Sequence, residues 1–381
     1  MKRLVGLLVF AMVLVSFGMA TPAAAGTSAA KPAAKGSRFI EGQYIVTLKS
    51  GVSAKGFTKG NGIATKYVYD KALNGFTAKL TLNQVAALKR NPNVATIEQD
   101  QIVSLAATQS PVTWGLDRID QRNRPLSGSY TYNTTASTVN VYVIDTGIQT
   151  SHPQFGGRAA VAYDALGGNG QDCQGHGTHV AGTIGGSTYG VAKGVRLWAV
   201  RVLGCNGSGS TSGIINAVNW LASNHRKPAV ANMSLGGGYS ASLNSAVTNM
   251  INAGVFTAVA AGNENQNACN VSPASASGTI TVAASDSSDR KASFSNYGGC
   301  VDIYAPGVSI TSAWINSGTN TISGTSMASP HVAGVGALYK ATYGDAAAST
   351  IISWIVNNST TNVISGNVTG TPNRLLFKGG L

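Results

Sequence analysis

One serine in this chain stands where a nucleophile would be activated. Ser326 follows Gly324-Thr325 and precedes apolar residues at helical spacing, so we expect it at the N-terminus of a helix. The unpaired backbone N–H groups and the dipole of a helix favour negative charge at that end. A serine in this position more often only caps its helix, and nucleophilic attack also requires a base that removes the hydroxyl proton.

Two further polar residues could complete such a site. His176 lies between two glycines at the start of another helical pattern, where an accessible imidazole can act as a general base. A zinc site at His176 and His179 is disfavoured, because the motif H-E-x-x-H needs a glutamate that is missing here. Asp145 follows an apolar run and is the first residue of Asp-Thr-Gly, a triplet typical of aspartic proteases. Those enzymes need two such aspartates, and the sequence has no second triplet of this kind, so this interpretation is disfavoured. Taken alone, Asp145 is as often a helix cap or a turn former.

Alternating strands and helices must position these residues. Continuous apolar runs, typical of strands covered on both faces, occupy residues 139–144, 195–202, 229–232, 255–260, 279–283 and 301–304. Helical patterns lie between them at 179–185, 212–224 and 240–253, and another begins at Ser326. The alternation predicts an α/β domain with a mostly parallel sheet flanked by helices, in which chemistry gathers at the carboxyl ends of the strands.

The composition divides the chain into four segments. Residues 1–25 combine a basic start, an apolar run and small residues, which predicts a secretory signal peptide that is too short to be a membrane anchor. Residues 26–38, rich in Ala, Lys, Gly and Pro, predict a linker. Residues 39–106 show short strand patterns and one helical pattern at 83–90, which predict a small α+β unit. Residues 107–381 are the α/β domain.

Charge and cysteine content exclude some classes of protein. Of the formal charge of +13, residues 1–106 contribute +9 (13 Lys/Arg against 4 Asp/Glu) and residues 107–381 only +4 (14 against 10). Residues 107–381 contain no basic cluster interleaved with aromatics, so nucleic acid is not an expected partner. The cysteines of an exported chain without a C-x-x-C pair predict disulfides, and the sequence alone leaves three pairings of Cys173, Cys205, Cys269 and Cys300.

Taken in chain order, Asp145, His176 and Ser326 lie in Val-Ile-Asp-Thr-Gly, Gly-His-Gly-Thr-His-Val-Ala-Gly-Thr and Gly-Thr-Ser-Met-Ala-Ser-Pro. These motifs and their order resemble the subtilisin-like serine proteases, in particular the proteinase K branch and, within it, aqualysin. Other stretches extend the resemblance over essentially all of the α/β domain, at 114–121, 232–237 and 260–263.

The resemblance implies a secreted serine endopeptidase of broad specificity that needs no cofactor for catalysis. Ser326 would attack the scissile carbonyl, His176 would take the proton and later donate it, and Asp145 would hold the imidazole. Asn263 and the backbone N–H of Ser326 would bind the oxyanion. An extended protein or peptide substrate would lie between two edge segments and beside small pockets, and the residues implied are Gly207, Ser208, Gly209, Ser234, Leu235, Gly236, Ala260, Ala261 and Gly262.

Residues 39–106 resemble the inhibitor-type propeptide of the same family, which assists folding and blocks the cleft. The stretch 50–62, where a first helix is expected, is short and glycine-rich, so we expect that helix to be reduced. The end of this segment would lie in the cleft, with autoprocessing between Ala106 and Ala107. The mature product is expected to be a monomer.

The resemblance also implies two disulfides, Cys173 with Cys205 and Cys269 with Cys300, and structural calcium. Asp302 with the carbonyl groups of Ser277 and Thr279 matches one calcium site of the family. A second site matches Asp117, Asp120 and Gln121, although these residues are alternatively surface acids near turns. Ser127 and Ser129 stand where some relatives have Asp and Asn, which lowers the charge of that second site.

Two rival functions use the same fold. One is a catalytically silent binding protein, which the complete set of Asp145, His176, Ser326 and Asn263 disfavours. The other is a transferase or esterase with the same nucleophile, which a casein-clearing assay of the unchanged chain against Ser326→Ala distinguishes.

Overall fold

The computed structural model describes residues 39–71, 73–101 and 107–381. The described chain forms two compact units, one built from residues 42–99 and the other essentially from residues 100–381. The predicted signal peptide and linker lie outside the described residues, as does Ala106 of the predicted cleavage site. Among the helices described, none is long and apolar enough to cross a membrane.

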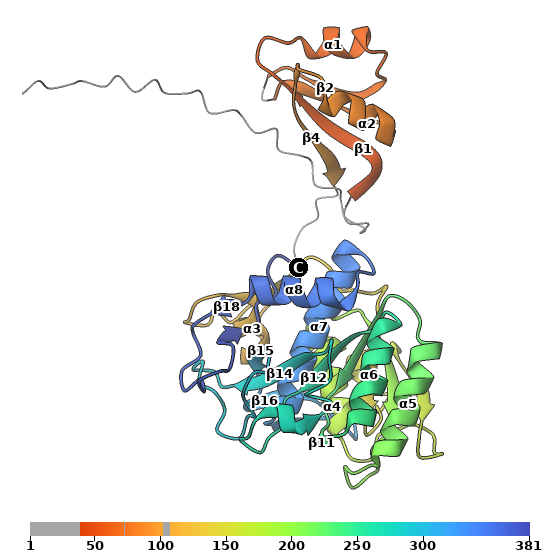
Figure 1. Ribbon diagram of the computed structural model, residues 1–381, viewed down its shortest axis with the longest axis vertical. Coiled ribbons are helices and arrows are strands. Elements are labelled where there is room, and N and C mark those ends of the chain that lie inside the picture. The colour runs from red at the N-terminus through yellow and green to blue at the C-terminus, as the bar shows by residue number, and fades with distance from the viewer. Residues whose placement is uncertain (1–38, 72, 102–106) are drawn as a thin grey trace, which may run out of the picture. The chain divides into compact units, whose positions relative to one another are not determined.

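The first unit is a four-stranded sheet with two helices (Figure 1). In spatial order the strands are β2 (Thr65–Tyr69), β3 (Gly75–Lys79), β1 (Phe39–Leu48) and β4 (Val94–Gln101), and the helices are α1 (Ala54–Gly60) and α2 (Leu82–Lys89). Val46, Phe57 and Phe76 belong to its apolar core. The helix expected to be reduced is present as the seven-residue α1, and the second begins at a capping box between Thr81 and Gln84.

A nine-stranded sheet lies at the centre of the second unit (Figure 1). In spatial order its strands are β18 (Thr360–Thr361), β19 (Arg374–Leu375), β15 (Ile303–Pro306), β14 (Ile280–Ser285), β12 (Phe256–Ala260), β10 (Ala229–Met233), β7 (Asn140–Asp145), β9 (Arg196–Arg201) and β8 (Ala159–Asp164). All neighbours from β19 to β8 pair in parallel, whereas β18 is antiparallel to β19. The predicted mostly parallel α/β architecture is confirmed.

Helices flank this sheet. They are α3 (Trp114–Asp120), α4 (His176–Gly185), α5 (Thr211–Asn224), α6 (Ala241–Asn252), α7 (Thr325–Tyr343) and α8 (Ala348–Asn358). Helices α5 and α6 lie side by side in Figure 1 and contact each other, and α4 contacts α7. Glycines permit close approach of α7 to the sheet, because a Cβ added at Gly336 would lie 2.2 Å from the Phe256 ring.

Short strands and turns complete the second unit. The strand pairs are β5 (Ala107–Gln109) with β6 (Tyr130–Tyr132), β11 (Gly237–Gly238) with β13 (Val271–Ser272), and β16 (Ile310–Trp314) with β17 (Gly318–Ile322); 3₁₀ turns are η1 (Pro153–Phe155) and η2 (Ala268–Asn270). The strand prediction missed β8 and the β16–β17 hairpin. Every residue of β8 is only half-buried, so its sequence lacks the continuous apolar run of the central strands.

Candidate active site

The carboxyl ends of three adjacent parallel strands bring the predicted residues to one edge of the sheet. Strand β7 ends at Asp145, and its neighbour β10 ends just before Ser234. The next strand, β12, ends three residues before Asn263. Parallel strands in register present their carboxyl ends together, so residues far apart in the sequence meet at this edge.

Asp145 and His176 form a direct pair. The Asp145 carboxylate is fully buried, whereas the His176 side chain is 23% exposed, and Nδ1 of His176 donates to Oδ1 of Asp145 at 2.8 Å. The backbone N–H of Thr146 donates to the same oxygen at 2.7 Å. With the proton on Nδ1, the neutral imidazole has Nε2 free to accept another proton.

The charge around His176 favours its protonated form. Burial lowers the pKa of His176, but the charge and hydrogen bond of Asp145 and the charge of Asp172 raise it, and the net shift is upward. The pair is therefore suited to hold an imidazolium that forms during a reaction.

Ser326 lies at the N-terminus of α7, as the sequence predicted. It is the second residue of the helix, and its backbone carbonyl accepts a hydrogen bond from the Ser234 hydroxyl at 2.7 Å. Its own Oγ donates to the backbone carbonyl of Ser234 at 3.1 Å rather than to His176. Such a hydrogen bond is compatible with a nucleophile, because catalytic hydrogen bonds commonly tighten only in the complex with substrate.

Two N–H donors border one small space beside Ser326. Oδ1 of Asn263 accepts hydrogen bonds from the backbone N–H and the hydroxyl of Thr325, at 2.8 and 2.9 Å, which fixes the amide. A Cβ added at Gly324 would lie 3.6 Å from Ser326 N and 3.7 Å from Asn263 Nδ2. The missing side chain of Gly324 therefore leaves room for an oxygen between these donors.

Two cavities flank the segment 235–238. The larger, of about 420 Å³, is lined by His176 and by the predicted residues Gly207, Ser208, Gly209, Ser234, Leu235 and Gly236. The smaller, of about 270 Å³, is lined by Ser326, Asn263 and the predicted residues Leu235, Gly236, Ala260 and Gly262. Ala261 lines neither cavity, because it is fully buried in an apolar cluster with Val301 and Tyr304.

The sequence reasoning missed several residues that line these cavities. Glu264 and Gln266 line the smaller one, together with Gly237, Gly238 and Val271. Glu264 is the one acidic side chain among its lining residues, and its carboxylate accepts a hydrogen bond from Asn296 at 2.9 Å. Its place directly after Asn263 was a signal that could have identified it.

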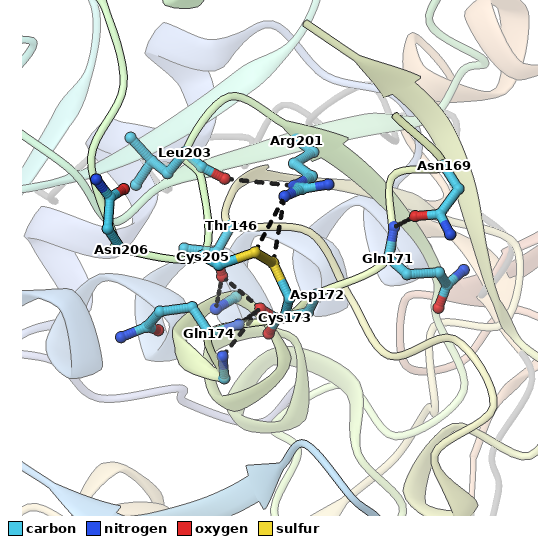
Figure 2. Close-up of a disulfide and its surroundings, with 12 residues drawn as sticks. Thr146, Asn169, Gln171, Asp172, Cys173, Gln174, Arg201, Leu203, Cys205 and Asn206 are labelled. Atoms are coloured by element: carbon cyan, nitrogen blue, oxygen red, sulfur yellow. Dashed lines mark hydrogen bonds between the residues drawn. A yellow bond between two sulfur atoms is a disulfide. The ribbon is translucent and has the colours of Figure 1, made fainter. Parts of the chain in front are cut away.

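The disulfides join the cysteines as the resemblance implied. Cys173 is bonded to Cys205 and Cys269 to Cys300, and the described chain has no free cysteine. Figure 2 shows the first bridge next to the Arg201 guanidinium, whose Nη2 lies 3.2 Å from Cys173 Sγ. This bridge closes the loop that enters α4 and thereby helps to place His176.

The first predicted calcium set contains a carboxylate in a suitable environment. Asp302 accepts one hydrogen bond, from the backbone N–H of Thr281 at 2.7 Å, and burial raises the pKa of its carboxyl group. A half-buried carboxylate, together with the backbone carbonyl groups of Ser277 and Thr279 in the segment that leads to its partner Thr281, would form a hard-oxygen set that suits calcium. The Ser277 carbonyl also accepts a hydrogen bond from Thr248 at 3.0 Å.

The second predicted calcium set is already engaged by protein groups. Asp117 accepts hydrogen bonds from the backbone N–H and hydroxyl of Ser127, at 3.1 and 3.0 Å. Asp120 pairs with the buried ammonium group of Lys378 at 2.9 Å, and the side-chain Oε1 of Gln121 accepts from the backbone N–H of Ser127 at 3.1 Å. These three side chains fit a calcium ion less well than Asp302 does, because N–H, O–H and ammonium donors occupy their oxygens. In the described residues, no cluster of three or more His, Cys, Asp or Glu side chains could hold a metal.

Fold and site together define a serine hydrolase, in which a serine at a helix end lies on the same sheet edge as a buried aspartate paired with a partly exposed histidine. Comparison with known families gives the narrower class. The model of the Subtilase family matches residues 136–376, and that of Peptidase inhibitor I9 matches residues 43–106. The chain belongs to the subtilase family.

Individual relatives agree with this assignment. An extracellular serine proteinase of Thermus sp. is 56% identical over 320 residues, which cover 83% of this chain and 78% of the relative. A subtilisin-like serine protease of Sarocladium strictum is 52% identical over 351 residues, 89% of this chain and 90% of the relative. The crystal structure of a cold-adapted subtilisin-like serine proteinase, 52% identical, superposes with a TM-score of 0.69 over 71% of this chain and 99% of that one. The chain is thus an extracellular serine endopeptidase with an inhibitor-type N-terminal segment.

Proposed function

We propose that the chain is the precursor of a broad-specificity endopeptidase that works through an acyl-enzyme. The observation that carries this proposal is the hydrogen-bonded pair of buried Asp145 and partly exposed His176 on the same sheet edge as Ser326. The Ser326 Oγ bonds to the scissile carbonyl carbon while His176 Nε2 takes its proton, and Asp145 holds the imidazole tautomer. The same proton then passes to the leaving amine as the C–N bond breaks, and water repeats the sequence to release the acid.

The tetrahedral intermediate places its negative oxygen between the Asn263 amide and the Ser326 backbone N–H. Both donors border the space left by Gly324. The hydrogen bonds from Thr325 hold the amide before the charge develops, so little reorganisation is needed during the reaction.

Substrate binding uses the two cavities and the strand edges beside them. An extended peptide adds between the segments 207–209 and 234–236, both of which line the larger cavity. Main-chain hydrogen bonds are indifferent to side chains, which favours broad specificity. The smaller cavity receives the side chain before the cut, and its Glu264 carboxylate extends the range of accepted residues to basic ones.

The precursor is organised in four segments: residues 1–25 as signal peptide, 26–38 as linker, 39–106 as inhibitory and folding-assisting propeptide, and 107–381 as catalytic domain. Cleavage between Ala106 and Ala107 is supported by the pairing of β5, just after this bond, with β6 of the catalytic domain. The match to the inhibitor family also ends at residue 106. The released enzyme acts as a monomer.

Calcium at Asp302, with the carbonyl groups of Ser277 and Thr279, stabilises the catalytic domain and takes no part in the chemistry. The half-buried position of this carboxylate, with a single hydrogen bond from Thr281 among the described residues, supports the site. The set of Asp117, Asp120 and Gln121 stays a prediction, and the contact of Asp120 with Lys378 weighs against it.

A single pair of variants tests the catalytic proposal. The unchanged precursor should release a product that begins at Ala107 and should degrade casein, whereas Ser326→Ala should remain uncleaved and inactive. Ser323→Ala is the matched control, because Ser323 precedes the same helix and its hydroxyl only accepts a hydrogen bond from the backbone of Ser309. Self-cleavage or casein degradation by purified Ser326→Ala would refute the role of this serine. Ester hydrolysis without casein degradation by the unchanged chain would favour an esterase or transferase.

A further inference from the structure

Asp172, in the loop that enters α4, uses both of its carboxylate oxygens. Oδ1 accepts hydrogen bonds from the backbone N–H groups of Gln174 and Gly175, both at 2.9 Å, and from the Thr146 hydroxyl at 2.9 Å. Oδ2 accepts from the backbone N–H and the hydroxyl of Thr178, at 2.9 and 2.6 Å. Figure 2 shows Asp172 and Thr146 drawn together beside the Cys173–Cys205 bridge. Asp172 thus accepts five hydrogen bonds, and those from Thr146 and Thr178 reach beyond its own loop.

These bonds tie the two members of the Asp145–His176 pair to each other. Thr146 follows Asp145 directly, and its hydroxyl accepts from the backbone N–H of Gly177 at 2.9 Å while donating to Asp172. His176 is the first residue of α4, so Asp172 contacts the amides on both sides of it. The helix end and the end of β7 are thus held by one side chain.

The backbones of α4 and β7 approach each other without space for adjustment. A Cβ added at Gly177 would lie 2.1 Å from the carbonyl oxygen of Gly147 and 3.2 Å from Cβ of Asp145. Because the two segments touch here, a small displacement of the loop would change the Asp145–His176 distance. A misplacement of about 1 Å can cost about 100-fold in rate.

Asp172 also contributes negative charge. Burial lowers the pKa of His176, and the charges of Asp145 and Asp172 are the two that raise it. The neighbouring His179 stays neutral, since burial lowers its pKa to about 4. Among the described residues, the other titratable groups on or beside elements in contact with α4 are Tyr142 on β7, Arg196 and Arg201 on β9, His331, Tyr339, Lys340 and Tyr343 on α7, His152 beside η1, and Arg158, which donates to the Gly185 carbonyl at the far end of α4.

We propose that Asp172 is a positioning residue of the catalytic site, which locks α4 to β7 around the Asp145–His176 pair and stabilises the imidazolium formed when Ser326 attacks. This inference rests on the catalytic roles proposed above. It assigns two separable effects to one side chain: geometry, carried by its hydrogen bonds, and charge, carried by its ionised carboxylate.

The two effects are separated by four variants of the full chain, matured and assayed for kcat and kcat/KM from pH 4 to 10 with an uncharged peptide amide. Asp172→Asn removes the negative charge and replaces one carboxylate oxygen by an NH₂ group, which cannot accept the hydrogen bonds that this oxygen accepted. Asp172→Glu keeps the charge but displaces it. Thr178→Val keeps the charge and removes one hydroxyl. Asp164→Asn is the matched control, because Asp164 also accepts backbone N–H bonds in this region, from Leu166 and Gly170, but its ion pair is with Arg201 on β9 and its hydrogen bonds do not reach α4.

All three variants at Asp172 and Thr178 should lower kcat on the pH plateau, Asp172→Asn by about 10- to 100-fold. Only Asp172→Asn should move the acid limb of kcat/KM to lower pH, because loss of the negative charge makes His176 easier to deprotonate. Asp164→Asn should change neither quantity. Thermal denaturation of each variant reports folding.

If the acid limb of kcat/KM in Asp172→Asn lies at the same pH as in the wild type, the role of the charge is overturned. If kcat in both Asp172→Glu and Thr178→Val equals that of the wild type, the geometric role is overturned. If Asp172→Asn yields no folded protein, the other two variants still decide the geometric role, and Asp172→Ser, which also removes the negative charge, tests the charge through the same shift of the acid limb to lower pH. The variant His176→Ala separates this inference from the proposed mechanism. If His176→Ala is inactive while Asp172→Asn has wild-type kinetics, only this inference is refuted. If His176→Ala is active, the proposed mechanism itself is refuted.

Discussion

The oxyanion role of Asn263 gives the sharpest quantitative prediction. Asn263→Ala removes one of two donors that border the space beside Gly324, and loss of such a donor costs about 2.7–4 kcal/mol, or about 100- to 1,000-fold in kcat. KM should stay within about twofold, because the hydrogen bond forms only as the charge develops in the transition state. The same change leaves two Thr325 donors without their acceptor, which should lower the unfolding free energy by about 1–2 kcal/mol.

Asn263→Asp separates catalysis from stability. The aspartate keeps an oxygen for both Thr325 hydrogen bonds but presents a negative acceptor where the amide N–H was, so kcat should fall at least as far while the melting temperature stays near that of the unchanged enzyme. Thr325→Val is the matched control: it removes the hydroxyl bonds to Asn263 and Gly262, and its effect on kcat should stay below about tenfold. Steady-state kinetics on a peptide amide measures these values. A kcat above one-tenth of wild type in both Asn263 variants, or a rise in KM alone, would refute the assignment.

Three further predictions concern stability. Calcium at a concentration of about 100 Kd should raise the unfolding free energy by about 2.7 kcal/mol. A chelator should therefore lower the melting temperature by several degrees in the unchanged enzyme but not in Asp302→Asn. Equal responses of the two proteins would exclude this site. Replacing Cys173 and Cys205 by serine removes a disulfide whose cysteines are 32 residues apart and which stabilises the fold by roughly 3–4 kcal/mol. The protein should still fold, and scanning calorimetry should show a melting temperature lower by roughly 10 °C. An unchanged melting temperature would contradict this prediction. Burial lowers the pKa of both His179 and His331 to about 4, against about 6.5 in the unfolded chain. Each histidine therefore contributes stability that is fully present above pH 6.5 and is lost as the pH falls toward 4, on the order of 3 kcal/mol. Denaturant titrations that give the same unfolding free energy over this pH range would disprove this prediction.

Much of the catalytic domain was predictable from local pattern. The strands β7, β10, β12 and β14 are buried throughout, so each appears in the sequence as an uninterrupted apolar run. The position of Ser326 in the first turn of α7 follows from glycine and small polar residues before a helical pattern. Half-buried β8 has no such signature and was missed.

The candidate site was predicted in its members but not in its connections. Three motifs in one order were enough to propose Asp145, His176 and Ser326, because each motif is short and specific. Glu264 in the smaller cavity was overlooked although it follows Asn263 directly, since that position shows nearness to the site but not which groups surround the side chain.

The sequence by itself determined the class of fold, the order of the motifs and the residues proposed for catalysis, because these depend on short-range pattern. Only the tertiary structure decided which distant groups meet: Thr146 with Asp172, 26 residues apart, and Asn263 with Thr325, 62 apart. Such contacts depend on how parallel strands and helix ends align in space, and no local propensity encodes that alignment. The placement of Asp172 around the Asp145–His176 pair is therefore visible only in the folded chain.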